Sequence, residues 1–139
     1  MFWKRTKIKL LFYAMLFTLI ACSQIRNEDE ELVEYIAKIT ASKSPEGNFI
    51  ILADNGCSGC RKIVQQYSLS HPQEEFETTL IIRDIKTLDM VKDDFWDFSG
   101  KLFIDSLRVY EKTDLNLPPA ISFSIQNGKI KPLPLDLDI

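Results

Sequence analysis

Short apolar runs alternate along the chain with segments whose apolar residues recur every three or four positions, a pattern typical of strands alternating with amphipathic helices. Phe49 to Ala53 is apolar at successive positions, which predicts a central strand covered on both faces. Helical spacing follows and predicts a helix that ends near Ser70, before Pro72. Thr78 to Asp84 is the next predicted strand, and the connection is long enough for a parallel crossover. Together they predict a right-handed beta-alpha-beta unit.

The following segment predicts a helix that packs one apolar face on the sheet. Apolar residues lie there among acids and lysine, and we expect them to be core: Met90, Val91, Phe95, Trp96 and Phe98. Gly100 breaks the pattern, and Lys101 to Asp105 is a candidate for a short strand. Leu107 and Tyr110 then predict a short helix.

A hairpin is predicted near the end of the chain. Asn127-Gly128 is a strong two-residue turn signal, since both residue types tolerate the positive φ that such a turn needs. Ala120 to Gln126 and Lys129 to about Leu133 should therefore pair antiparallel. Pro132 and Pro134 discourage further pairing.

An acidic segment precedes the first strand. Asn27-Glu28-Asp29-Glu30-Glu31 suits the first turn of a helix that runs to about Ser42, because carboxylates complement the helix dipole there. The predicted buried face consists of Leu32, Val33, Ile36 and Ile39. Ser44-Pro45-Glu46-Gly47 then predicts a turn.

The first residues have the character of an export signal. Lys4, Arg5, Lys7 and Lys9 precede the apolar stretch Leu10 to Ile20, which is short for a membrane-spanning helix. Leu19-Ile20-Ala21-Cys22 resembles the lipobox of bacterial lipoproteins, in which the cysteine is cut free and lipidated. We therefore expect a lipoprotein signal peptide at 1–21, a lipidated acidic tether at 22–31 and one domain at 32–139. A plain signal peptide and a retained signal anchor are the alternatives.

Composition agrees with an exported protein of one domain. Removal of residues 1–21 leaves 118 of 139 residues, with 13 basic and 20 acidic side chains and a net charge of −7, which argues against nucleic-acid binding. The acidic cluster beside Cys22 resembles the surface-export signal of lipoproteins in the Bacteroidetes. We expect a bacterial cell-envelope protein, anchored through Cys22 to the outer membrane and facing the periplasm or the surface.

Cys57-Ser58-Gly59-Cys60 is the strongest chemical signal, because it lies where the first strand is followed by a helix. The dipole at a helix N-terminus stabilises a thiolate on Cys57, and Cys60, one turn on, can resolve a mixed disulfide. Ser58 and Gly59 are expected to tune the redox potential. Arg61 and Lys62 either support the thiolate or are ordinary solvated charges.

A beta-alpha-beta unit with Cys-x-x-Cys at its first helix, followed by Pro119 before a hairpin, resembles the thioredoxin superfamily. The lipidated or membrane-tethered thiol-disulfide oxidoreductases of the TlpA type are the most similar branch, over roughly Phe49 to Leu133. The resemblance implies an α/β thioredoxin-like fold, a central mixed sheet flanked by helices, here with an extra N-terminal helix. It also implies that Pro119 is the cis-proline of the substrate groove, with Ala120 in place of the usual threonine. Pro118 is the competing candidate.

Three departures from the family pattern stand out. Gly56 occupies the position before the first cysteine, where thioredoxins carry tryptophan, and Ile51 occupies that of the buried proton-relay aspartate. Asp54 is the nearest acid and is expected to be more exposed. The chain stops at Ile139 without the family's C-terminal helix, so we expect the N-terminal helix to cover that sheet face, or the face to stay open for a partner.

Two functions are consistent with these residues. In the first, the protein is a thiol-disulfide oxidoreductase, with Cys57 attacking and Cys60 resolving, that acts on exported proteins or thiols together with a redox partner. In the second, it is a non-catalytic binding module with a structural disulfide. Metal binding is disfavoured, because His71 is the single histidine and structural zinc usually takes four protein ligands. No cofactor is expected.

Overall fold

The structure is a computed structural model that describes residues 27–55, 57, 59–70, 78–86, 88–95 and 98–135. The expected signal peptide, Cys22, Gly56, Ser58 and His71 lie outside these residues. The elements in chain order are α2 (Glu28–Thr40), β1 (Gly47–Ala53), α3 (Cys60–Ser70), β2 (Thr78–Arg83), α4 (Leu88–Asp94), β3 (Lys101–Ile104), the 3-10 helix η1 (Tyr110–Lys112), β4 (Ala120–Gln126) and β5 (Lys129–Leu133).

The strands form one mixed sheet in the order β3-β2-β1-β4-β5. β1 pairs parallel with β2, β2 pairs parallel with β3, and the β4–β5 hairpin adds to the other side of β1 antiparallel. β1 is therefore central, and residues 50–53 are fully buried, as the uninterrupted apolar run predicts. The parallel β1–α3–β2 unit is likewise confirmed.

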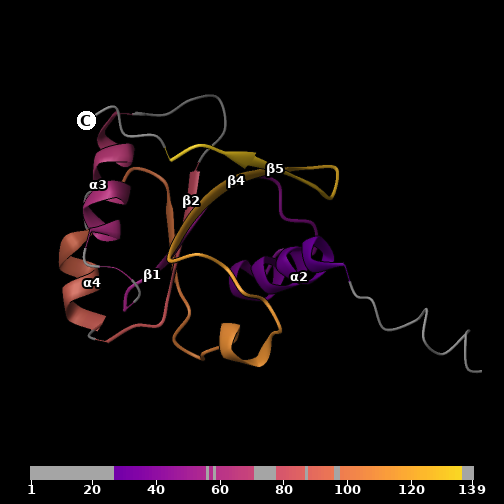
Figure 1. Ribbon diagram of the computed structural model, residues 1–139, viewed down its shortest axis with the longest axis horizontal. Coiled ribbons are helices and arrows are strands. Elements are labelled where there is room, and N and C mark those ends of the chain that lie inside the picture. The colour runs from indigo at the N-terminus through magenta and orange to yellow at the C-terminus, as the bar shows by residue number, and fades with distance from the viewer. Residues whose placement is uncertain are drawn as a thin grey trace, which may run out of the picture.

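Helices cover both faces of the sheet (Figure 1), which makes the described chain an α/β fold. Alternate residues of β1 point to opposite faces. Phe49 and Ile51 pack with Leu32, Tyr35 and other residues of α2 in one buried cluster. Ile50 and Leu52 pack with residues of α3 and α4 in the other. The sequence suggested that this sheet face is either covered by the N-terminal helix or open for a partner. The structure shows that α2 covers it.

The hairpin agrees with its prediction at every strand boundary. Asn127 has φ of 52° and Gly128 has φ of 72°, the left-handed conformations that a tight two-residue turn requires. β5 is an edge strand, and Pro132 lies in it opposite Phe123.

Several boundaries differ from expectation for local reasons. α2 ends at Thr40 rather than near Ser42, because Ala41 takes the left-handed conformation with φ of 54°. β2 stops at Arg83, since Asp84 is also left-handed. The start of α2 agrees with its prediction: α2 begins after Asn27, whose side chain accepts a hydrogen bond from the Asp29 N–H at 3.3 Å, and Glu28 to Glu31 form its first turn.

The region after α4 differs most. α4 ends at Asp94, with Val91 and Phe95 buried and Phe98 half-buried beneath it, as expected of core residues, while Trp96 lies outside the described residues. The short helix predicted from Leu107 and Tyr110 is only the single turn η1. Leu107 lies before η1 and is 78% exposed, so it is not part of the short helix predicted for it.

Candidate active site

Cys57 and Cys60 form a disulfide with their Cα atoms 5.3 Å apart. Their surroundings differ. Cys57 is exposed, whereas Cys60 is 8% exposed and packs with Val64 and Leu52 in the core cluster beneath α3. An incoming thiol or disulfide can therefore reach the Cys57 sulfur from solvent, while the Cys60 sulfur is shielded by protein.

The motif lies between β1 and α3, as the sequence predicts, and α3 begins at Cys60. The Cys60 N–H donates a hydrogen bond to the Cys57 Sγ at 3.2 Å. The first turn of α3 carries no acidic residue. Both features favour negative charge on the Cys57 sulfur, because unpaired N–H groups and the helix dipole stabilise an anion there.

Arg61 is not an ordinary solvated charge, and its support of the Cys57 thiolate stays a prediction. Its guanidinium forms ion pairs with Asp54, at the end of β1, and with Asp94, at the end of α4. The Asp54 side chain is 2% exposed and also accepts a hydrogen bond from the Lys86 N–H at 3.1 Å, so the expectation that it is more exposed is wrong. Arg61 therefore neutralises a buried carboxylate and ties α3 to two neighbours, whereas Lys62 is exposed.

Ile51 belongs to the cluster beneath α2 and is completely buried. Cys60 belongs to the cluster on the opposite face of the sheet. The side chain at position 51 therefore packs as core, and Asp54 is the buried acid near the motif.

Pro119 lies where β4 begins, beside the end of β1. Its carbonyl accepts a hydrogen bond from the Ala53 N–H at 2.7 Å, which ties the start of β4 to the strand that leads to Cys57. No peptide bond among the described residues is cis, so the expected cis bond before Pro119 is not found. The trans form is the lower in energy for an X-Pro bond by about 0.5–1 kcal/mol. The proposed groove role of Pro119 stays a prediction.

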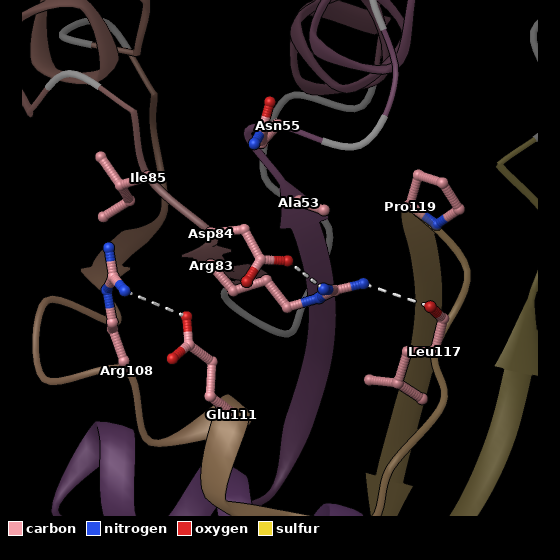
Figure 2. A pocket seen from close by; sticks show the side chains of 9 residues that line it. All are labelled: Ala53, Asn55, Arg83, Asp84, Ile85, Arg108, Glu111, Leu117 and Pro119. Carbon is pink, nitrogen blue, oxygen red and sulfur yellow. Dashed lines mark hydrogen bonds and ion pairs between the residues drawn. The ribbon is translucent and has the colours of Figure 1, made fainter.

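A cavity of about 450 Å³ lies at the same edge of the sheet, and Figure 2 shows the side chains that line it. Ala53 and Asn55 line it from the end of β1, and Arg83 to Ile85 line it from the end of β2. Leu117 and Pro119 close it on the side of β4. The carboxyl ends of parallel strands are where open α/β sheets place ligands.

Among the charged residues that line this cavity, Arg83 is buried, at 6% exposure. Its guanidinium pairs with Asp84, lies 4.0 Å from the ring centroid of Tyr110, and donates to the Leu117 and Pro118 carbonyls at 3.2 and 3.3 Å. Its Nε has no hydrogen-bond partner among the described residues. From the sequence, Arg83 was interpreted only as part of a predicted strand. A charged residue that ends a buried apolar run is itself a signal of a site residue.

A buried network joins α2 to the segment around η1. The Asp105 carboxylate accepts hydrogen bonds from the Val109 and Tyr110 N–H groups at 2.8 and 2.9 Å and from the Tyr35 hydroxyl at 3.2 Å. Burial raises the pKa of Tyr35 well above its usual range, and the negative charge of Asp105 adds to the effect. The Tyr35 hydroxyl is therefore neutral across the physiological range.

Among the described residues, no group of three or more histidine, cysteine or acidic side chains is arranged to hold a metal ion. Over the same part of the chain, no helix is both long and apolar enough to cross a membrane. Comparison with protein-family models, with curated proteins and with solved structures gave no match.

Proposed function

We propose that the protein is a thiol-disulfide oxidoreductase that works through Cys57 and Cys60. The observation that carries the proposal is the asymmetry of the pair: Cys57 is exposed and accepts an N–H hydrogen bond at the start of α3, and Cys60 is buried behind it. This is the arrangement that an attacking and a resolving cysteine require.

The exchange balances in two steps. In the reduced protein, the Cys57 thiolate attacks one sulfur of a substrate disulfide, forms a mixed disulfide and releases the other sulfur as a thiolate. The Cys60 thiolate then attacks the Cys57 sulfur, closes the Cys57–Cys60 disulfide and releases the second substrate thiolate. Two electrons pass from protein to substrate, and the same steps in reverse oxidise a substrate dithiol.

We extend the proposal to the fold family and the location. The parallel β1–α3–β2 unit, the Cys-x-x-Cys pair at α3 and the hairpin that follows Pro119 support a thioredoxin-like fold of the TlpA type. The sequence around Cys22 supports a lipid anchor and a place in the bacterial cell envelope, where exported proteins or thiols are the substrates. This part of the proposal rests on the sequence and the fold, without support from a matching protein.

The test is a trapping experiment in the full-length chain. Cys60→Ser leaves Cys57 free to form a mixed disulfide that nothing resolves, so covalent adducts with envelope proteins should accumulate on non-reducing gels. Cys57→Ser is the matched control and should trap none, because the remaining thiol is buried. Equal trapping by both variants, or by neither, would contradict the proposal.

A second function is favoured by one observation. The buried acid nearest the motif, Asp54, is already paired with Arg61, so it is not a free proton acceptor for Cys60. If the disulfide is static and the domain is a binding module, its potential in a glutathione buffer should lie below about −300 mV. An oxidoreductase should instead equilibrate with that buffer between about −270 and −120 mV.

A further inference from the structure

The cavity beside β1 and β2 carries four charges of alternating sign, and the redox proposal uses none of them. Arg83 and Arg108 supply two guanidinium groups, while Asp84 and Glu111 supply two carboxylates. The four charges sum to zero. A cavity with both signs on its wall suits a ligand that also carries both.

Arg83 places a fixed positive charge in the lining of the cavity. Stacking over Tyr110 and bonds to Asp84, Leu117 and Pro118 hold its guanidinium in one place. Its Nε–H is buried without a partner among the described residues, a state that usually costs about 1–3 kcal/mol. Because this nitrogen is enclosed by protein, Arg83 acts on a ligand in the cavity through its fixed positive charge rather than through this donor.

Arg108 and Glu111 form the outer wall and are free to exchange partners. Their ion pair spans 3.6 Å between side chains that are 72% and 51% exposed, and such surface pairs contribute only about 0–1 kcal/mol. A ligand carboxylate can replace Glu111 on Arg108, and a ligand ammonium can then pair with the released Glu111 or with Asp84.

The remaining wall is apolar. Ile85, Leu117 and Pro119 border the cavity, and Ile85 and Leu117 are half-buried. This wall offers an aliphatic side chain a surface away from water. A volume of about 450 Å³ is at the lower end of the usual range for small-molecule sites.

We propose that this cavity binds a free α-amino acid with an aliphatic side chain. Its carboxylate is held by Arg108 and attracted by the fixed charge of Arg83, and its ammonium is held by Asp84 and Glu111. The site does not depend on the disulfide, although both lie at the same edge of the sheet.

The test is an amide NMR titration of the full-length chain with L-leucine. N-acetyl-L-leucine keeps only the negative charge and L-leucinamide only the positive one, so they are matched probes for the two halves of the site. L-leucine should give saturable shifts at Asp84, Arg108 and Glu111 with a Kd in the millimolar range or below. Each blocked probe should bind at least tenfold more weakly, because it loses one set of charge pairs.

Arg83 is buried, so a substitution there would disturb folding as well as binding. Substitutions of the exposed Arg108 and Glu111 avoid this problem. Arg108→Gln and Glu111→Gln should each weaken leucine binding at least fivefold, whereas Lys112→Gln, an exposed neighbour in η1, should leave it unchanged. The Cys57→Ser/Cys60→Ser variant should bind as the wild type does, so a failed redox proposal would not affect this result. Absence of saturable shifts at millimolar leucine, equal binding of a blocked probe, or unchanged binding by Arg108→Gln would overturn the proposal.

Discussion

Arg61 is the residue that fixes the position of the cysteine helix. It follows Cys60 directly, and its two ion pairs attach the first turn of α3 to the end of β1 through Asp54 and to the end of α4 through Asp94. Asp54 also accepts the Lys86 N–H, so the same carboxylate orders the loop after β2. The orientation of the disulfide therefore depends on the ion pair between Arg61 and the buried Asp54 carboxylate.

Arg61→Ala should lower the free energy of unfolding by about 3 kcal/mol. The change strands the Asp54 carboxylate, which is 2% exposed, while the 22% exposure of Arg61 puts the effect at the low end for a broken buried pair. Denaturant unfolding measures it, with Lys62→Ala as the exposed control. The double variant Asp54→Asn/Arg61→Ala should recover part of the loss, and no recovery would mean that the Asp54 charge is not the cause.

The part of the candidate site that could be predicted from the sequence consists of residues close together in the chain. The spacing of Cys57 and Cys60 after an apolar run places them at a strand-to-helix junction, and the structure has them there. The distant partners of Arg61 and Arg83 were not predictable. Asp94, which pairs with Arg61, and the Tyr110 ring and the Leu117 and Pro118 carbonyls, which contact Arg83, come from elements far along the chain, and only the folded sheet brings them together.

At the scale of elements, β3 is placed by a close backbone approach at Gly100. A Cβ added at this position would overlap the carbonyl oxygen of Thr78, at the start of β2, and press on the Phe98 ring. Gly59, in the cysteine motif, is the opposite case, since a Cβ there meets nothing within 4 Å and its φ is not positive. The two glycines thus serve different purposes.

Gly100→Ala should destabilise the protein by about 1–3 kcal/mol, because the backbone of β2 or β3 must shift. Gly59→Ala should instead stabilise it by about 0.4–1 kcal/mol, through the smaller entropy of the unfolded chain. Thermal unfolding of the two variants beside the wild type compares them directly. A Gly100→Ala variant as stable as Gly59→Ala would show that the approach to Thr78 does not constrain β3.

Elements with local signals agreed best with their sequence predictions. The hairpin matches because Asn127-Gly128 determines its own turn. The segment between β3 and β4 matched worst, since η1 and its neighbours are ordered by the carboxylate of Asp105 and the hydroxyl of Tyr110 rather than by an apolar repeat. Periodicity alone carries no information about such contacts.

At the scale of the molecule, Tyr35 and Asp105 connect the helix layer of α2 to the far edge of the sheet. Tyr35 also packs edge-on against Tyr110, with ring centroids 5.7 Å apart, and Tyr110 lies beneath Arg83 at the cavity. The protonated hydroxyl of Tyr35 is therefore part of the contact between the α2 layer and the cavity wall.

The stability of the protein should fall at high pH because of this contact. The pKa of Tyr35 is raised in the folded state, so its contribution is fully present below the unfolded value of about 10 and declines as pH rises above it, by up to about 1.4 kcal/mol per pH unit. Tyr35→Phe should cost about 1 kcal/mol near neutral pH through the lost hydrogen bond to Asp105. Urea unfolding of both proteins gives the difference between their free energies of unfolding. This difference, in favour of the wild type, should be constant to about pH 9 and shrink above it. A constant advantage to pH 11 would contradict the assignment.

The central position of β1 also has a consequence for how the chain acquires its fold. Phe49 pairs with Phe123, so the middle of the sheet closes only when the last third of the chain has been made. Contacts this distant in sequence slow folding, and an unpaired β1 is an apolar edge until β4 arrives. Cys57 and Cys60 are close in sequence and need no such delay. During biogenesis their oxidation can therefore precede the completion of the domain that later buries Cys60.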